Sequence, residues 1–260
     1  MIEILYGRNA VCESLRAGQR KPYKLTLAEG VQRTDAIGQI IFLARQAGVP
    51  VTYADRRNLD RIGDVNHQGV ALETSEYPYS GLEELLAAAQ ARNESPFLLL
   101  LDLLKDPQNV GTLLRTAEAV GVHGVVIQQR RAAGITPAVV QASGGAVEHL
   151  RIAQVTNLVD AVGRLKARDV WVAGLEAVRG ARQYDQADLS GPLALTVGSE
   201  GEGLRRLVRE RCDFLVCIPM CGQITSLNVA VAGSIALYEA WRQRTSHMKD
   251  GEARWAEGRP

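Results

Sequence analysis

The chain has 260 residues, of which 46% are hydrophobic and 23% are charged, and its formal net charge is +1. This composition predicts a folded globular protein and argues against an intrinsically disordered one. The near-neutral total does not point to a nucleic-acid partner, although a local basic patch would be compatible with it.

The cysteines and the apolar runs argue against a disulfide-rich, zinc-binding, secreted or membrane-spanning protein. Cys12, Cys212, Cys217 and Cys221 are too few and too irregularly spaced for a disulfide framework, and no second Cys/His pair near the last two completes a zinc site. We therefore expect free thiols in a reducing cytoplasm and no metal. No basic segment followed by an apolar stretch opens the chain, and the longest purely apolar run, residues 97–101, is too short to span a bilayer.

The first part of the chain, residues 1–74, alternates short helices and strands. Ala10, Val11 and Leu15 lie at helical spacing before Gly18, which suits a helix end. A second helix is expected to begin at Thr34 or Asp35. The predicted helices cover residues 9–17, 35–47 and 55–62, and the predicted strands cover 23–28, 49–53 and 69–73.

Residues 75–81 contain Pro, Gly and Ser without helical periodicity and are predicted to be a linker. Apolar strands and helices then alternate through residues 82–246, which predicts an α/β domain with a parallel sheet and helices on both faces. A polar tail, 247–260, follows. The predicted strands are 97–103, 124–128, 170–175, 193–197 and 214–218, and the predicted helices are 82–92, 110–120, 157–168, 203–211 and 226–244.

Residues 102–119 join a predicted buried strand to a helix through a turn that contains proline. Asn109 stands where the helix is expected to begin, so N-capping explains it without a function. Arg115 lies nearly two turns further on, where a solvated charge or a structural ion pair explains it. This segment alone favours structural roles for both residues.

Residues 195–204 run from an apolar strand into Gly198, Gly201 and Gly203. Glycines at the carboxyl end of a strand let the backbone approach a ligand, and open α/β sheets bind ligands at that edge. The spacing fits neither a dinucleotide fingerprint nor a P-loop. Glu200 and Glu202 would repel a phosphate but tolerate a sulfonium. An ordinary glycine-rich turn explains the segment equally well.

Residues 217–232 contain a strand end, a loop and the start of a long apolar helix. Ser226 suits the N-cap of that helix, and Asn228 is a polar residue at an otherwise apolar helix start. A buried polar group needs a partner, and here the partner could be structural or catalytic.

Taken together, in this order and spacing, the three segments resemble the SpoU/TrmH family of RNA ribose 2′-O-methyltransferases, part of the SPOUT superfamily. Residues 143–146 (Ser-Gly-Gly-Ala) also look like a family segment. Residues 6–11 and 67–69 are similar to the small L30e-like substrate-binding domain of members that methylate a guanosine in large-subunit ribosomal RNA. The motifs N-x-G-x-x-x-R-T-A, G-x-E-x-x-G, I-P-M and S-L-N-V stand at residues 109–117, 198–203, 218–220 and 226–229.

The resemblance implies that S-adenosylmethionine (AdoMet) donates a methyl group to a ribose 2′-hydroxyl, with a guanosine of 23S rRNA as the expected acceptor. It also implies a deep trefoil knot near the C-terminus, which is rare among folds. Family members are homodimers whose active site is completed near the subunit interface, and the long apolar final helix could contribute to such an interface. No metal and no membrane are implied.

The resemblance also implies roles for individual residues. Arg115 would assist loss of the hydroxyl proton; because an arginine side chain almost never deprotonates, it could instead hold an RNA phosphate and polarise the hydroxyl as a cation. Asn109 and Ser226 would orient Arg115 or the ribose, Asn228 would fix the loop or contact substrate, and Glu200 would anchor the glycine turn. The donor-binding residues carried over from the family are Gly198, Gly201, Ile218, Met220 and Leu227.

Five basic residues close together in sequence predict an RNA-binding patch in the first domain, with ordinary solvated charge as an equal alternative. His67 is expected to be a surface or capping residue rather than a base reader. Asn9 stands where the family often has histidine, and Ala230 where serine is common. The predicted patch residues are Arg8, Arg16, Arg20, Lys21 and Lys24.

Three other interpretations stay open. The first changes the substrate to transfer RNA, against which only the L30e-like domain argues. The second is an RNA-binding protein that has lost catalysis, which the complete motif set disfavours. The third is a doubly wound dinucleotide enzyme, disfavoured because its glycine fingerprint is missing.

Overall fold

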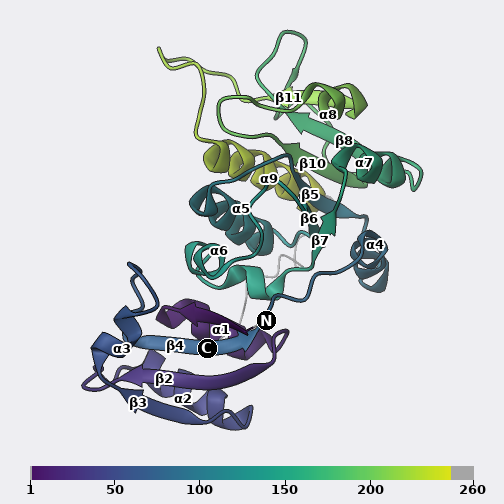
Figure 1. Ribbon diagram of the computed structural model, residues 1–260. Helices are drawn as coiled ribbons and strands as arrows, with labels where there is room; N and C mark the ends of the chain where they lie inside the picture. Colours follow the sequence, from purple (N-terminus) through teal and green to yellow (C-terminus); the bar gives the residue numbers. More distant parts are fainter. Residues whose placement is uncertain (1, 247–260) are drawn as a thin grey trace.

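The computed structural model describes residues 2–246, so the predicted tail at 247–260 lies outside the described residues. Two sheets organise the chain: a four-stranded sheet in the N-terminal domain and a seven-stranded sheet in the following domain. Figure 1 shows the N-terminal sheet and its helices at the bottom and the larger body above them. The irregular residues between β4 (Val70–Ser75) and α4 (Leu82–Ala91) connect the two.

The N-terminal sheet is mixed, in the order β1-β4-β2-β3. Its centre, β4, runs antiparallel to both neighbours, whereas β3 runs parallel to β2. The sequence did not predict β1, whose five residues pair with β4 along their whole length. The strands are β1 Ile2–Tyr6, β2 Pro22–Ala28, β3 Val51–Ala54 and β4, and the helices are α1 Arg8–Ala17, α2 Asp35–Gln46 and α3 Arg56–Asp60.

Local chemistry explains the helix ends of this domain. Gly18 has a φ of +63° and its N–H donates to the Ser14 carbonyl, as expected of a glycine that terminates a helix. Thr34 occupies the N-cap position of α2, and Asp55 caps α3 by accepting from the Arg57 N–H. The predicted starts and stops in this domain are therefore confirmed to within a few residues.

The second sheet contains seven parallel strands in the order β7-β6-β5-β10-β8-β11-β9. The chain builds outward from β5 through β6 to β7 and later returns to the other side of β5 with β10, so β5 and β10 flank a topological switch point. The strands are β5 Phe97–Leu101, β6 Gly124–Gln128, β7 Ile152–Val155, β8 Trp171–Leu175, β9 Arg182–Gln183, β10 Leu193–Val197 and β11 Phe214–Cys217.

Helices cover both faces of this sheet, which confirms the predicted α/β architecture. Alternate residues of β5 point to opposite sides: Leu99 and Leu101 join the core beneath α5, α6 and α9, whereas Leu98 and Leu100 join the core beneath α4, α7 and α8. Burial on both faces explains the continuous apolar run of β5. The remaining helices are α5 Pro107–Ala119, α6 Pro137–Ala142, the 3₁₀ turn η1 Ala146–His149, α7 Leu158–Lys166, α8 Arg206–Arg211 and α9 Val229–Thr245.

A buried ion pair joins the two domains. The Arg20 Nε lies 2.9 Å from Glu148 Oε1, and both side chains are fully buried. The same guanidinium pairs with Glu3 and lies 5.3 Å from the centre of the Tyr77 ring. Arg20 was predicted to bind RNA; that prediction is wrong for this structure, because the side chain is enclosed between the domains.

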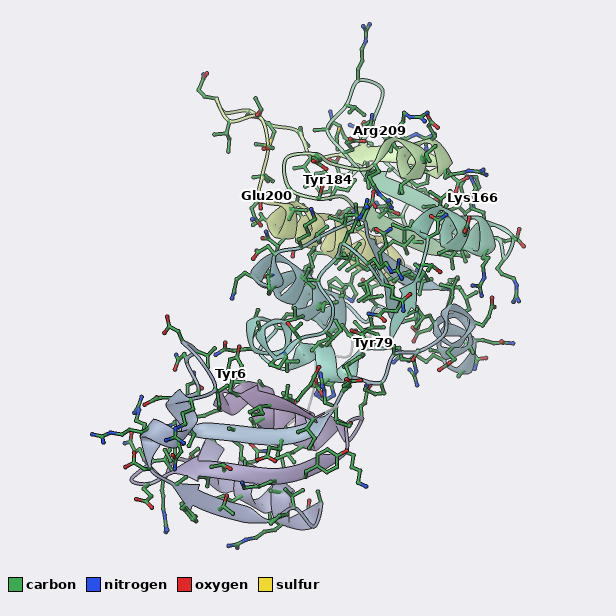
Figure 2. All side chains as sticks on the ribbon, in the orientation of Figure 1. Tyr6, Tyr79, Lys166, Tyr184, Glu200 and Arg209 are labelled. Atoms are coloured by element: carbon green, nitrogen blue, oxygen red, sulfur yellow. The ribbon has the colours of Figure 1, made fainter. Side chains whose placement is uncertain are left out.

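The predicted linker is likewise held in place. Tyr77 is buried, and its hydroxyl donates to the Leu150 carbonyl at 2.6 Å. The Tyr79 hydroxyl accepts from the Ile135 N–H at 2.9 Å, and the Ser80 N–H donates to the Ile152 carbonyl at 2.8 Å. Figure 2 shows Tyr79 at this junction. The segment therefore fastens the N-terminal domain to the larger sheet.

Candidate active site

The carboxyl ends of β5 and β10 lie side by side, and a buried carboxylate secures the loop that follows β10. Asp102, fully buried after β5, accepts from the Arg205 backbone N–H at 2.9 Å and from its Nε at 2.7 Å. A charge this deep requires such a partner. Sequence reasoning did not single out Asp102 as a functional residue, although an aspartate directly after a continuous apolar strand was an available signal.

The glycine segment after β10 closes on itself. Ser199 and Gly203 exchange two backbone hydrogen bonds of 3.0 Å each. A Cβ placed on Gly198 would lie 2.2 Å from the Gly203 carbonyl carbon, so no larger residue fits without moving the loop. Gly203 has a φ of +67°, a conformation that favours glycine. The loop geometry by itself therefore requires these glycines.

Three motif residues from distant segments form a chain of hydrogen bonds. The Asn109 Nδ2 donates to Glu200 Oε2 at 3.1 Å, and the Asn228 Nδ2 donates to Asn109 Oδ1 at 2.9 Å. Figure 2 shows Glu200 on the side of the molecule where α9 lies. The bonds join the glycine loop to the starts of α5 and α9, so these three elements can hold a ligand in one fixed geometry.

Both predicted helix caps at this site are wrong by a few residues. Asp106, not Asn109, caps α5 by accepting from the Asn109 N–H at 2.9 Å. Asn228, not Ser226, caps α9 by accepting from the N–H groups of Ala230 and Val231. Because Asp106 caps α5, the Asn109 side chain is free to bind Glu200. Asn228 caps α9 through its Oδ1 and binds Asn109 through its Nδ2.

Arg115 is exposed on α5 and makes no hydrogen bond or ion pair within residues 2–246. Its Nη1 lies 3.1 Å from the place where a Cβ on Gly144 would stand. A Cβ on the next residue, Gly145, would lie 2.6 Å from the Cβ of Glu13 in α1. The turn at Gly144 and Gly145 therefore packs closely against Arg115 on one side and against α1 of the N-terminal domain on the other.

The loop before α9 offers its backbone to a ligand. Within the described chain, residues 218–227 make no backbone–backbone hydrogen bond. Ile218, Met220 and Leu227 are partly buried, whereas the Ser226 side chain is exposed and bonds neither Asn109 nor Arg115. Free N–H and C=O groups between partly buried apolar side chains suit the edges of a purine ring together with an apolar chain.

Comparison with known proteins decides the family. Residues 96–238 match the model of the SpoU rRNA Methylase family, and residues 4–80 match that of the RNA 2′-O ribose methyltransferase substrate-binding domain. The chain belongs to the SpoU rRNA methylase family. The predicted resemblance is thereby confirmed, and with it an RNA methyltransferase of the SpoU/TrmH type.

Individual relatives of this SpoU family member cover nearly its whole length. YacO of Bacillus subtilis, named as a TrmH family tRNA/rRNA methyltransferase, is 46% identical over 93% of this chain and 96% of its own. The SpoU methyltransferase AviRb from Streptomyces viridochromogenes, solved with AdoMet, has a TM-score of 0.79 at 25% identity over 94% and 90% of the two chains. An AdoMet-bound rRNA methyltransferase from Sinorhizobium meliloti has a TM-score of 0.74 at 27% identity, over 93% and 87%.

Three residues of the predicted basic patch have partners within the N-terminal domain. Arg16 pairs with Glu13, Lys24 lies 3.4 Å from Glu73, and Lys21 lies 5.8 Å from the centre of the Tyr23 ring. With Arg20 buried, Arg8 remains; its Nε donates to the Gln68 carbonyl at 3.4 Å beside a cavity. Without Arg20, the basic patch stays a prediction.

Other basic residues, not predicted, lie at the edge of the sheet that carries the site. Lys105 follows β5, and Arg130 and Arg131 follow β6; all three are exposed at the carboxyl edge of the parallel sheet. The Ala133 N–H donates to the Leu104 carbonyl at 2.8 Å, which joins the two loops. These residues could have been predicted from their positions directly after predicted parallel strands, because the loops after such strands meet at one edge of the sheet.

The groups that thiol reactivity and metal binding would require are the cysteine, histidine and acidic side chains. All four cysteines are free, and burial raises the pKa of Cys212 to about 12, which keeps that thiol protonated and unreactive. Among residues 2–246, no group of three or more His, Cys, Asp and Glu side chains could hold a metal ion. Within the same residues, no helix is both long and apolar enough to cross a membrane.

Proposed function

We propose that this protein transfers the methyl group of AdoMet to a ribose 2′-hydroxyl, that of a guanosine in 23S rRNA. The observation that carries the proposal is the hydrogen-bonded set Asn109, Glu200 and Asn228 on the three motif segments at the sheet switch point. Asn109 lies on α5, the helix that also carries the unpaired Arg115. Open α/β sheets bind their ligands at this edge.

The donor would lie between the glycine loop and the loop before α9. Gly198 and Gly201 would face it from the first loop, and Ile218, Met220 and Leu227 from the second. The free backbone groups of residues 218–227 suit an adenine edge, and the carboxylates of Glu200 and Glu202 tolerate a sulfonium. AdoMet supplies an electrophilic methyl group when bound. The trefoil knot stays a prediction of the family resemblance.

Arg115 would act on the acceptor as a cation. The guanidinium is exposed and unpaired among the described residues, so it can bind a phosphate of the RNA and polarise the neighbouring 2′-hydroxyl. Asn109, Asn228 and Glu200 would hold the two loops and α5 in register, which fixes the in-line approach of the hydroxyl oxygen to the methyl carbon. Ser226, exposed on the second loop, would contact the ribose.

The RNA would be held by both domains. Arg8, Lys21 and Lys24 would contact it from the N-terminal domain, and Lys105, Arg130 and Arg131 from the edge of the catalytic sheet. The family model of the N-terminal domain describes substrate binding. The resemblance of this domain to an L30e-like fold favours ribosomal RNA by analogy. Transfer RNA remains the second candidate, because the name of the Bacillus subtilis relative covers both substrates.

A second copy of the chain would complete the enzyme. Val231, Tyr238 and Trp241 of α9 are 47%, 50% and 40% exposed, and their spacing of seven and three residues places them on one side of the helix. Large apolar groups in a row on one helix are typical of an interface with another chain. We therefore expect a homodimer that buries α9 of both copies.

The decisive experiment combines two measurements. Calorimetric titration with AdoMet is expected to show one site per chain. Mass mapping of ribose methylation is then carried out on purified 23S rRNA and on purified tRNA after incubation with the protein. Methylation of a 23S guanosine would support the full proposal. Methylation of tRNA alone would support the second candidate, a tRNA methyltransferase. AdoMet binding without methylation of either RNA would contradict both.

A further inference from the structure

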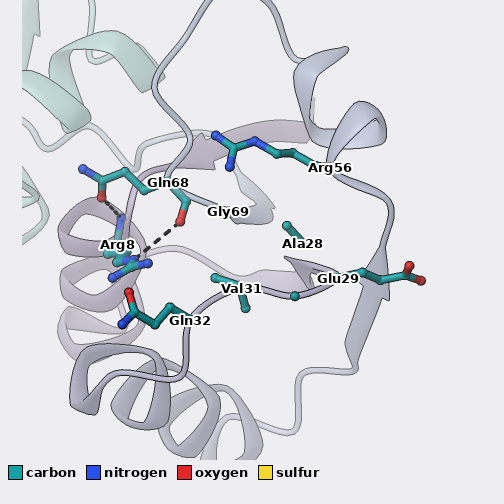
Figure 3. A pocket seen from close by; sticks show the side chains of 9 residues that line it. Arg8, Ala28, Glu29, Val31, Gln32, Arg56, Gln68 and Gly69 are labelled. Carbon is teal, nitrogen blue, oxygen red and sulfur yellow. Dashed lines mark hydrogen bonds between the residues drawn. The ribbon is translucent and has the colours of Figure 1, made fainter.

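A cavity of about 520 Å³ opens in the N-terminal domain, away from the motif residues. Figure 3 shows Arg8 and Gln32 on one side of it and Arg56 along the top, with its guanidinium reaching toward Gln68. Ala28 and Val31 contribute an apolar lining, together with the backbone of Gly30 and Gly69. The volume lies within the usual range of small-molecule sites, about 300 to 1,000 Å³.

A strained turn builds one wall of this cavity. Gln68 has a φ of +52° and Gly69 a φ of +77°, and positive φ is uncommon for a residue such as glutamine. His67, which is buried, holds the turn: the Gly69 N–H donates to its Nδ1 at 3.0 Å, and its Nε2 donates to Asp60 Oδ1 at 2.9 Å. Strain of this kind persists where the surroundings enforce it and often marks a binding site.

The lining has the chemistry of a nucleotide site. Neither guanidinium, Arg8 nor Arg56, has a carboxylate partner among residues 2–246, so both can bind a phosphate. The Gln32 amide can both donate to and accept from a base edge, whereas Gln68 Oε1 accepts from the Arg8 backbone N–H at 2.9 Å and leaves the Gln68 Nε2 to donate. Figure 3 shows the Glu29 carboxylate turned away from Arg8, so it does not cancel the positive charge there.

Helix α6 lies between the strained turn and the candidate active site. The Gln141 Nε2 of α6 donates at 2.8 Å to the carbonyl of Asn66, next to the strained turn. Gly144, just after α6, lies against the Arg115 guanidinium. One short helix, α6, therefore contacts the loop that leads into the cavity wall at one point and precedes the glycine turn beside Arg115.

We propose that this cavity binds a nucleotide extruded from the RNA substrate, close to the nucleotide whose ribose is methylated. The inference rests on the proposed function, and it adds a recognition subsite in the other domain. Single-stranded or extruded bases are what proteins read in RNA, because their edges and faces are then accessible. Gly69 keeps the cavity open, since a Cβ there would lie 2.9 Å from Val31 Cγ2.

Adjacent arginines allow a charge-matched test. Arg56→Ala removes a cation from the rim, whereas Arg57→Ala removes the same charge from the next residue of α3, which does not line the cavity. The KM for the RNA is expected to rise about tenfold in Arg56→Ala and less than about twofold in Arg57→Ala, with kcat and AdoMet affinity unchanged in both. Gln32→Ala, at an exposed position, is expected to resemble Arg56→Ala.

A fluorescent base reports the extrusion itself. 2-Aminopurine is placed in turn at each position flanking the methylated nucleotide of an RNA fragment. One position is expected to change its fluorescence on binding wild type and Arg57→Ala, but not Arg56→Ala or Gln32→Ala. Equal KM values for the two arginine variants, or a signal that survives both cavity variants, would overturn the inference while leaving methyl transfer intact. Loss of methyl transfer in the wild type would contradict the proposed function instead.

Discussion

Asn109, Glu200 and Asn228 of the catalytic domain come from segments up to 119 positions apart, yet two hydrogen bonds join them. The five basic residues predicted to form a patch in the N-terminal domain lie close together in sequence, yet Arg16, Arg20 and Lys24 pair with three different carboxylates. The difference arises because the parallel sheet brings all strand ends to one edge, whereas neighbouring residues on strands and helices point in different directions.

The largest expected effect tests whether the catalytic edge acts through its unpaired cation. Arg115→Ala is expected to lower kcat by about 100- to 1,000-fold, because a preorganised charge at the reacting hydroxyl is lost. AdoMet affinity, measured by calorimetry, should stay within about twofold, since Arg115 would contact the acceptor rather than the donor. Arg115→Lys, which keeps the charge without the planar fork, is the control and should retain part of the activity. Near-normal turnover in Arg115→Ala would remove this residue from the mechanism.

The buried ion pair between the domains is the next largest test. Glu148→Ala removes one of the two carboxylates that pair with the buried Arg20 guanidinium, and Glu3 remains. The free energy of unfolding is therefore expected to fall by about 3 kcal/mol, the lower end of the cost of breaking a buried ion pair. Urea denaturation measures this loss. Glu73→Ala, which removes the half-exposed partner of Lys24, is the control and should cost less than about 1 kcal/mol. Equal losses in the two variants would show that Arg20 is no more buried in solution than Lys24.

The hydrogen-bonded motif residues give a smaller effect. Asn109→Ala removes the bonds to Glu200 and Asn228 but leaves the Asp106 cap of α5 and the Asn228 cap of α9 in place. AdoMet affinity is expected to fall about tenfold, or 1.4 kcal/mol, because the two loops lose their common anchor. Thr112→Ala, at an exposed position of the same helix, is the control for calorimetry. Unchanged affinity in Asn109→Ala would mean that the chain of bonds does not shape the donor site.

The smallest effect concerns His123, a buried residue at the start of β6. Burial lowers the pKa of His123, against the opposing effect of the hydrogen bond that its Nε2 donates to Glu94, and the Phe97 N–H donates to Nδ1 at 3.1 Å. The unfolded chain therefore takes up this proton first as pH falls below about 6.5, and stability present above that pH is lost. Between about pH 7.5 and about pH 5.5, urea unfolding of wild type should lose about 1 kcal/mol more than that of His123→Asn. Parallel pH profiles for the two proteins would contradict this assignment.

Much of the fold was predictable because the signals are local. Strands β6 and β10 begin and end where their apolar runs do, since a strand buried on both faces needs no other pattern. Gly18 ends α1 because a glycine adopts positive φ at little cost. By contrast, β1, α6 and β7 were missed, because they are short and depend on neighbours already in place. The helix caps were misplaced because several cap-forming residues stand within a few positions of each other.

By itself, the sequence determined the α/β class and the family motifs, including Asn109, Glu200 and Asn228. Only the tertiary structure decided which polar group meets which: that Asn109 bridges Glu200 and Asn228, that Asp102 secures Arg205, and that Arg20 is buried against Glu148. Helix and strand formation respond to residues a few positions away, whereas the partner of a charge depends on which distant strands the sheet sets side by side.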